Sequence, residues 1–64
     1  MQNWIGNAYA KMRVNHITQK QLAEKVGVTK DWISLIFLGK ASASEQMKNR
    51  IITAIEELVT ERSS

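Results

Sequence analysis

The chain lacks the residues on which several classes of small protein depend. It has no cysteine among its 64 residues, which excludes a disulfide framework and a thiolate zinc site and is compatible with a reducing compartment. Its single histidine, His16, cannot form a metal site alone. We expect this side chain to be solvated in a loop, and the alternative is a phosphate contact. Packing of apolar side chains must therefore supply the stability, without a metal or cofactor.

Long apolar runs and the usual catalytic patterns are also missing. Apolar residues make up 44% of the chain but never continue for the ~18 residues of a membrane span. Lys11 and Arg13 follow the apolar residues of the N-terminus instead of preceding them, unlike a secretory signal. No serine has a histidine pattern to activate it, and no glycine-rich phosphate loop is present. We therefore expect a cytoplasmic protein that is not an enzyme.

Proline is absent and only three glycines occur, so few positions interrupt a helix. Apolar and polar residues never alternate for long enough to indicate a strand. A chain of this size buries only ~60% of the surface that it exposes when unfolded. The sequence predicts a single all-α domain over residues 1–64, a small bundle of four or five helices.

Two short helices are predicted around Gly27. Thr18 is a suitable N-cap for a helix over 19–26, and Gln21 stands three residues later, as in a capping box. Thr29 can cap a third helix over 30–37 that ends before Gly39. Hydrophobic pairs flank both caps, namely Ile17 with Leu22 and Val28 with Ile33. Gly27 tolerates the left-handed conformation that often ends a helix, so we expect a tight turn there.

Longer helices are predicted on either side of this pair. The first covers 3–14, with an apolar stripe formed by Ile5, Ala8, Tyr9 and Met12. The last begins after Ser42, whose spacing to Glu45 fits a capping box, and runs to about Arg62. Its stripe is wider than one contact needs, so the first helix or a second subunit must cover the excess. Candidates for contact with a second subunit are Ile52 and Val59.

Charge is unevenly distributed along the chain, whose net charge is +3. Residues 1–30 contain five lysines and arginines against one glutamate, a net charge of +4, whereas residues 56–64 contain one arginine against three glutamates, a net charge of −2. We expect the basic and acidic ends to form separate surfaces. The basic surface suits a polyanionic partner, although a solvated basic face without a ligand would have the same composition.

Residues 18–40, TQKQLAEKVGVTKDWISLIFLGK, resemble the helix-turn-helix of the phage repressor and Cro (XRE-like) family. The small Ala23, the turn glycine Gly27 and the two hydrophobic pairs agree with the family's pattern over about a third of the chain. The resemblance implies a lambda-repressor-like DNA-binding domain, with the helix-turn-helix at about 19–37, that regulates transcription in a bacterial or phage-infected cell. A helical hairpin with no DNA role could share these core positions.

The resemblance also implies roles for individual residues. The outward positions of the third helix, whose side chains reach base edges in the major groove, are Lys30, Asp31, Ser34 and Leu35. Positions expected at the DNA backbone are Gln19, which also supports the recognition helix, Thr29 and Lys40, together with Lys20 and the indole of Trp32. Lys30 could contact guanine or a phosphate, and Asp31 could accept from cytosine or only complement the helix dipole. Leu35 offers apolar contact to a thymine methyl group.

The third helix is more apolar than the family's pattern. Phe37 and Leu38 stand where polar residues are common, so they could fold back onto the last helix, or they could form a protein interface with Trp32 and Leu35. One module buries only ~600–1,000 Å² on DNA, which favours a homodimer on a palindromic operator. The alternatives are a protein-interaction module that modulates another regulator and a DNA-bending accessory protein.

Overall fold

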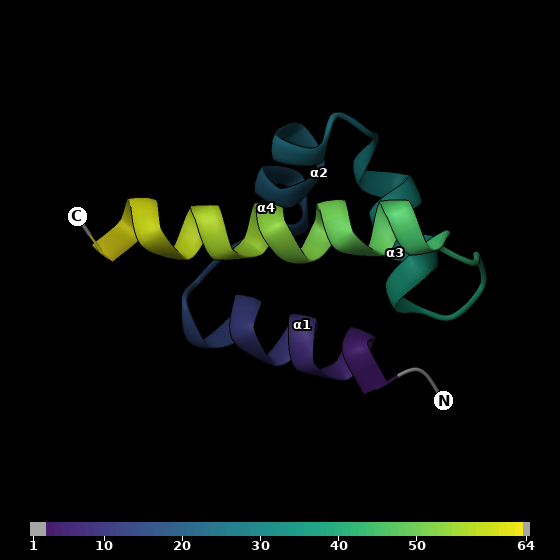
Figure 1. The fold of residues 1–64 in the computed structure, drawn as a ribbon, viewed down its shortest axis with the longest axis horizontal. Helices are drawn as coiled ribbons and strands as arrows, with labels where there is room; N and C mark the ends of the chain where they lie inside the picture. Colours follow the sequence, from purple (N-terminus) through teal and green to yellow (C-terminus); the bar gives the residue numbers. More distant parts are fainter. Residues whose placement is uncertain (1–2, 64) are drawn as a thin grey trace.

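The computed structural model describes residues 3–63, with side chains from Trp4 to Arg62. Four α-helices follow one another along the chain: α1 (Asn3–Val14), α2 (Gln19–Val26), α3 (Lys30–Phe37) and α4 (Glu45–Ser63). No strand occurs within these residues (Figure 1). The all-α prediction is confirmed with four helices, and the predicted bounds of the first three match the structure.

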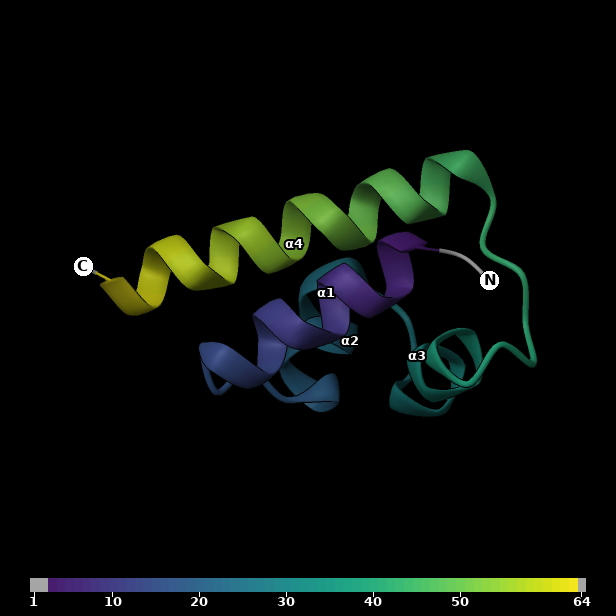
Figure 2. The same cartoon turned by 90° about the horizontal axis from the view of Figure 1, so that it is seen from below.

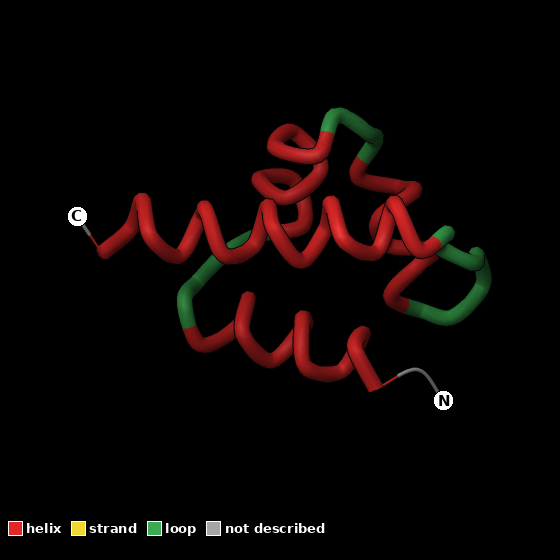
Figure 3. Tube along the Cα trace, viewed as in Figure 1, coloured by secondary structure: helices red, strands yellow, loops and turns green. Residues whose placement is uncertain are grey.

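The helices are arranged in layers around α4. This helix spans much of the longest dimension of a molecule that measures 34 × 22 × 18 Å, and α2 and α3 lie behind it in Figure 1. Seen from below, α1 lies beside α4 and runs in the same direction along it (Figure 2). The longest connection joins α3 to α4, as the green segments of Figure 3 show. None of these helices combines the length and apolar character needed to cross a bilayer.

All four helices contribute to one buried apolar cluster. Its largest fully buried side chains come from each helix in turn: Met12, Leu22, Ile33, Ile36, Ile51 and Ile55. Burial of each such side chain stabilises the fold by about 1.5–3 kcal/mol relative to an exposed one. No polar or charged side chain among residues 4–62 is buried. The fold of the described residues therefore depends on apolar packing, as the composition predicts.

The predicted caps of α2 are confirmed. The Gln21 amide donates to Thr18 Oγ1 at 3.0 Å, and the Thr18 amide donates to Gln21 Oε1 at 2.9 Å, which completes the capping box. Gly27 is left-handed, with φ 93° and ψ 30°. The amides of Gly27 and Val28 both donate to the Ala23 carbonyl, at 2.8 and 3.0 Å. These bonds satisfy groups that the end of a helix leaves without partners.

The helix α3 also begins as predicted. The Trp32 amide donates to Thr29 Oγ1 at 3.1 Å, so Thr29 is the N-cap. At the other end Gly39 has φ 79°, and the Lys40 amide donates back to the Leu35 carbonyl at 2.9 Å. The chain therefore turns sharply after α3, and this turn fixes where the backbone of Lys40 lies.

The predicted start of the last helix is wrong, because Ser44 and not Ser42 caps α4. The Met47 amide donates to Ser44 Oγ at 3.1 Å, and the Lys48 amide donates to the Ser44 carbonyl at 2.8 Å. Ala41 and Ala43 pack against the core while the intervening serine is exposed. This alternation requires an extended backbone, so the helix cannot begin until the second alanine has passed.

Candidate nucleic-acid interface

The helices α2 and α3 form a compact unit joined by the turn at Gly27. Leu22, Ala23 and Val26 are buried on α2, and Ile33 and Ile36 are buried on α3. The two helices therefore face each other through apolar side chains, and the opposite side of α3 is turned away from the core. This unit consists of two eight-residue helices joined by a tight turn.

The outer side of α3 carries the residues that the sequence predicts as base contacts. Lys30 and Asp31 in its first turn are exposed, and Ser34 is half-buried. Leu35 is 39% exposed and lies outside the buried cluster. These positions share one side of the helix, because residues three and four apart are neighbours on a helix surface. All four side chains therefore lie on a single surface.

A hydrogen bond links this surface to the first turn of α2. Ser34 Oγ donates to Gln19 Oε1 at 2.6 Å, in a part-buried position. The bond fixes the hydroxyl proton of Ser34 within the protein and holds the beginning of α2 against the middle of α3. The side-chain nitrogen of Gln19 takes no part in this bond, so its donor capacity remains.

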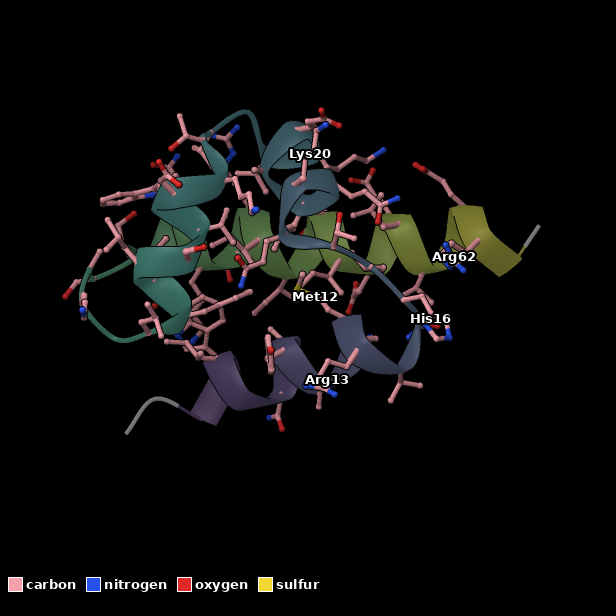
Figure 4. The ribbon with its side chains drawn as sticks, turned by 180° about the vertical axis from the view of Figure 1, so that it is seen from behind. Met12, Arg13, His16, Lys20 and Arg62 are labelled. Atoms are coloured by element: carbon pink, nitrogen blue, oxygen red, sulfur yellow. The ribbon has the colours of Figure 1, made fainter. Side chains whose placement is uncertain are left out.

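Three exposed lysines surround α3. Lys20 at the start of α2, Lys30 at the start of α3 and Lys40 after its end are exposed, and none forms a salt bridge within the part of the chain that the structure describes. Figure 4 views the molecule with α2 and α3 in front and places Lys20 on the opposite side from Arg13. These lysines are available to an external anion.

Thr29 and Trp32 contribute at the start of α3. The Thr29 oxygen accepts the Trp32 amide, which leaves the hydroxyl proton of Thr29 free to donate. Trp32 is 36% exposed, so much of its indole is supported by protein while part of it reaches solvent. Both side chains contain a hydrogen-bond donor, and both residues lie within two positions of the exposed Lys30.

Phe37 and Leu38 have different surroundings. Phe37 is half-buried and makes an edge-to-face contact with Tyr9 of α1, with ring centroids 6.0 Å apart and an interplanar angle of 73°. The Arg13 guanidinium lies 5.9 Å from the centroid of the same Tyr9 ring. Of the two alternatives for this pair, neither describes both residues, since Phe37 packs against the core beside Tyr9 of α1 and Leu38 is 69% exposed.

The expectation of separate basic and acidic surfaces is wrong at one place. Lys25 Nζ of α2 lies 2.6 Å from Glu61 Oε2 near the end of α4. The hydrogen bond to Glu61, with the charges of Glu61 and Glu57, raises the pKa of Lys25 above its usual 10.5, while partial desolvation opposes the shift. Lys25 is therefore engaged by α4 and is not part of the free basic surface around α3.

Arg50 has a role that the sequence analysis missed. Its Nη2 donates to the Val26 carbonyl at 2.6 Å, so a guanidinium on α4 caps the C-terminal end of α2. Cations stabilise this end of a helix because its last carbonyls carry partial negative charge. No spacing in the sequence marks this contact, since the two residues are 24 positions apart and meet only after the helices pack.

The two residues expected to contact a second subunit, Ile52 and Val59, have different surroundings. Ile55, which belongs to the wide stripe of α4, is buried, and it lines a groove of about 190 Å³ with Trp4 and Ala8 of α1. The helix α1 therefore covers this part of the wide apolar stripe of α4. Ile52 is half-buried and lines the same groove, whereas the half-buried Val59 packs against the core. Of the two, Ile52 is the less supported by its own chain.

Metal chemistry finds no support among the described residues. No group of three or more histidine, aspartate or glutamate side chains lies close enough there to hold a metal ion. His16 is exposed in the turn after α1 and has φ 58°, so it lies in a loop as predicted.

Comparisons with known proteins identify no relative. No protein-family model, no curated protein and no solved structure matches this chain. Function must therefore be inferred from the chemistry of the surface formed by α2 and α3.

Proposed function

We propose that this protein binds duplex DNA in a sequence-dependent manner and acts as a small transcriptional regulator of the phage repressor or Cro type. The observation that carries the proposal is the outward side of α3, which is held on α2 by buried isoleucines and surrounded by three lysines that form no ion pair with any described residue. An α-helix fits the major groove of B-DNA. In this proposal α3 is the recognition helix of a lambda-repressor-like domain.

The backbone contacts in this proposal come from groups around α3. Lys20, Lys40 and the Gln19 amide contact phosphates, Thr29 donates its hydroxyl, and Trp32 donates its indole N–H. These contacts supply much of the affinity, and it falls as salt rises because bound phosphates release counterions. Base contacts then set the sequence preference, with Lys30 donating to guanine and Asp31 accepting from an exposed base amino group.

In this proposal two copies of the protein bind one duplex together. A single module buries only ~600–1,000 Å² of protein surface on DNA, so one copy alone binds weakly. Two copies related by a two-fold axis place their recognition helices ~34 Å apart on successive turns of the duplex. The preferred operator is then palindromic. The half-buried Ile52 beside the groove between α1 and α4 is the first candidate for the subunit contact.

Selection from random duplexes, followed by salt titration of the best site, tests the proposal. We expect a palindromic consensus and a steep fall of affinity with salt. Lys30→Glu should weaken binding by about tenfold or more, because it removes a donor and adds a repelled charge. Arg62→Glu is the matched control: it makes the same change of charge at the far end of α4 (Figure 4) and should have a small effect. Absence of any duplex binding at low salt would contradict the proposal.

The exposed apolar surface favours a second candidate function, binding to another regulatory protein. Leu38 is 69% exposed and borders a shallow hollow of about 470 Å³ that is also lined by Ile5, Tyr9 and Phe37. Exposed apolar patches commonly mark protein interfaces. The two functions respond differently to Lys30→Glu, which weakens DNA binding by about tenfold or more but leaves binding to an apolar partner largely intact.

A further inference from the structure

The middle of the outward surface of α3 is apolar. Asp31, Leu35 and Leu38 lie at intervals of four and three residues, so they follow one line along the helix. Leu35 is 39% exposed and Leu38 is 69% exposed. Along the side of α3 that would face the bases, the next side chain after Asp31 is therefore that of Leu35.

Ser34, the polar residue next to Leu35, is already hydrogen-bonded within the protein. The Ser34 hydroxyl donates its proton to Gln19 Oε1 at 2.6 Å, so it is not a free donor to a base. Leu35 itself has no hydrogen-bonding group. The feature of a major-groove edge that such a side chain can recognise is the C5 methyl group of thymine, which no other standard base carries.

Leu35 and Leu38 differ in their distance from the N-terminal part of α3. The N-terminal part of a recognition helix contacts base edges, and Leu35 follows Asp31 by one helical turn, about 6 Å along the axis. Leu38 is the residue at which α3 ends, and it lies further from that N-terminal part. Leu35 is also more supported by the protein than Leu38, so less side-chain freedom is lost on binding.

We infer that Leu35 is a specificity-determining residue that selects thymine through its methyl group. The inference rests on the proposed DNA-binding function and names the base chemistry that α3 prefers. The selected thymine lies within about two base pairs of the base contacted by Asp31, since base pairs are stacked at ~3.4 Å. Specificity at this position comes from apolar contact and not from a hydrogen bond.

Replacement of thymine by uracil tests the inference, because it removes only the methyl group. Each thymine of the best selected duplex is replaced in turn by deoxyuridine, and the dissociation constant is measured with the unmodified protein. Loss of one buried methyl group should weaken binding about fourfold at one half-site, and about fifteenfold when both half-sites are changed. This scan does not depend on the folding of any variant.

Combining the uracil substitution with protein variants shows which leucine contacts the methyl group. In Leu35→Ala, the uracil substitution should change affinity by less than about 1.5-fold, because the partner of the methyl group is gone. Leu38→Ala is the matched control, since it shortens the same residue type on the same helix and should keep the fourfold effect. Thermal melting checks that both variants fold.

The outcomes separate this inference from the proposed function. Binding that is insensitive to uracil at every thymine overturns the inference and leaves DNA binding intact. A uracil effect that disappears in Leu38→Ala but persists in Leu35→Ala also overturns it. Failure of the unmodified protein to bind any duplex overturns the proposed function itself.

Discussion

At the scale of single residues, the backbone conformation of Gly27 governs the joint between α2 and α3. Its φ of 93° lies in the left-handed region, which residues with a side chain adopt only at a cost. A Cβ at this position would meet nothing closer than Arg50 Nη2, at 4.0 Å. The requirement for glycine is therefore conformational and not steric.

We predict that Gly27→Ala lowers the free energy of unfolding by about 1–2 kcal/mol, the cost of a left-handed residue that carries a Cβ. Gly6→Ala is the matched control, because Gly6 is exposed within α1 and a Cβ there meets nothing within 4 Å. It should stabilise the protein by about 0.5–1 kcal/mol. Urea denaturation measures both changes. Equal effects of the two substitutions would contradict a conformational role for Gly27.

At the scale of elements, α2 is a helix of eight residues that is held at both ends. The capping box of Thr18 and Gln21 satisfies its first amides, and Arg50 reaches from α4 to the carbonyl of Val26. Helices this short are marginal on their own. The position of α2, and with it the position of the neighbouring α3, therefore depends on these bonds as well as on the core.

Arg50→Met should lower the free energy of unfolding by about 1 kcal/mol, because a charged hydrogen bond to the end of α2 is lost while the apolar stem is kept. Lys48→Met removes a cation from the same helix, where Lys48 is partly exposed and lies 3.7 Å from the exposed Glu45. This control should change stability by about 0.5 kcal/mol or less. Hydrogen exchange of the last amides of α2 locates the effect, and an unchanged rate in Arg50→Met would argue against the cap.

The candidate interface depends on the same elements. Gln19 belongs to the first turn of α2 and bonds to Ser34 in the middle of α3, so both helices determine where the outward side chains of α3 lie. A change that loosens α2 should therefore weaken the proposed DNA binding at α3 without altering any of the proposed contact residues. Arg50 is in this sense a positioning residue for the proposed interface.

At the scale of the whole molecule, one ion pair joins α2 to the end of α4. Lys25 and Glu61 are 36 positions apart in the sequence, and their bond fixes the C-terminal part of α4 against α2. Both side chains are partly exposed, 32% and 58%, so solvent screens the pair. Its contribution is best recognised by its dependence on pH.

The pKa of Lys25 is raised in the folded protein by its bond to Glu61. A raised pKa means that the folded state holds the proton more tightly, so the contribution to stability is complete below the unfolded pKa of about 10.5 and is lost as pH rises through the folded value. The difference in unfolding free energy between the unmodified protein and Lys25→Met should be constant near neutral pH and decline above pH 10.5.

Denaturation at a series of alkaline pH values measures this difference. Glu61→Gln is the control, because it removes the partner and leaves Lys25 in place, and it should abolish the same alkaline decline. A difference that stays constant at high pH would show that the pair contributes nothing that depends on its charge.

Most helices of this protein follow from local patterns in its sequence. The all-α class, the bounds of α1, α2 and α3, the caps at Thr18 and Thr29 and the left-handed Gly27 all follow from interactions within a few residues of each other. Such interactions act through the local backbone and hardly depend on the rest of the fold. The outward positions of α3 follow in the same way, because helical periodicity decides which side is buried once Ile33 and Ile36 face the core.

The contacts between the helices do not follow from such local patterns. The bonds from Ser34 to Gln19 and from Arg50 to Val26, the pair of Lys25 with Glu61 and the contact of Phe37 with Tyr9 join residues from different helices. The start of α4 at Ser44 also belongs here, since packing of Ala41 and Ala43 overrode a local capping pattern. Their formation depends on where the helices pack, and that is set by burial of the whole apolar cluster, which no short spacing in the sequence encodes.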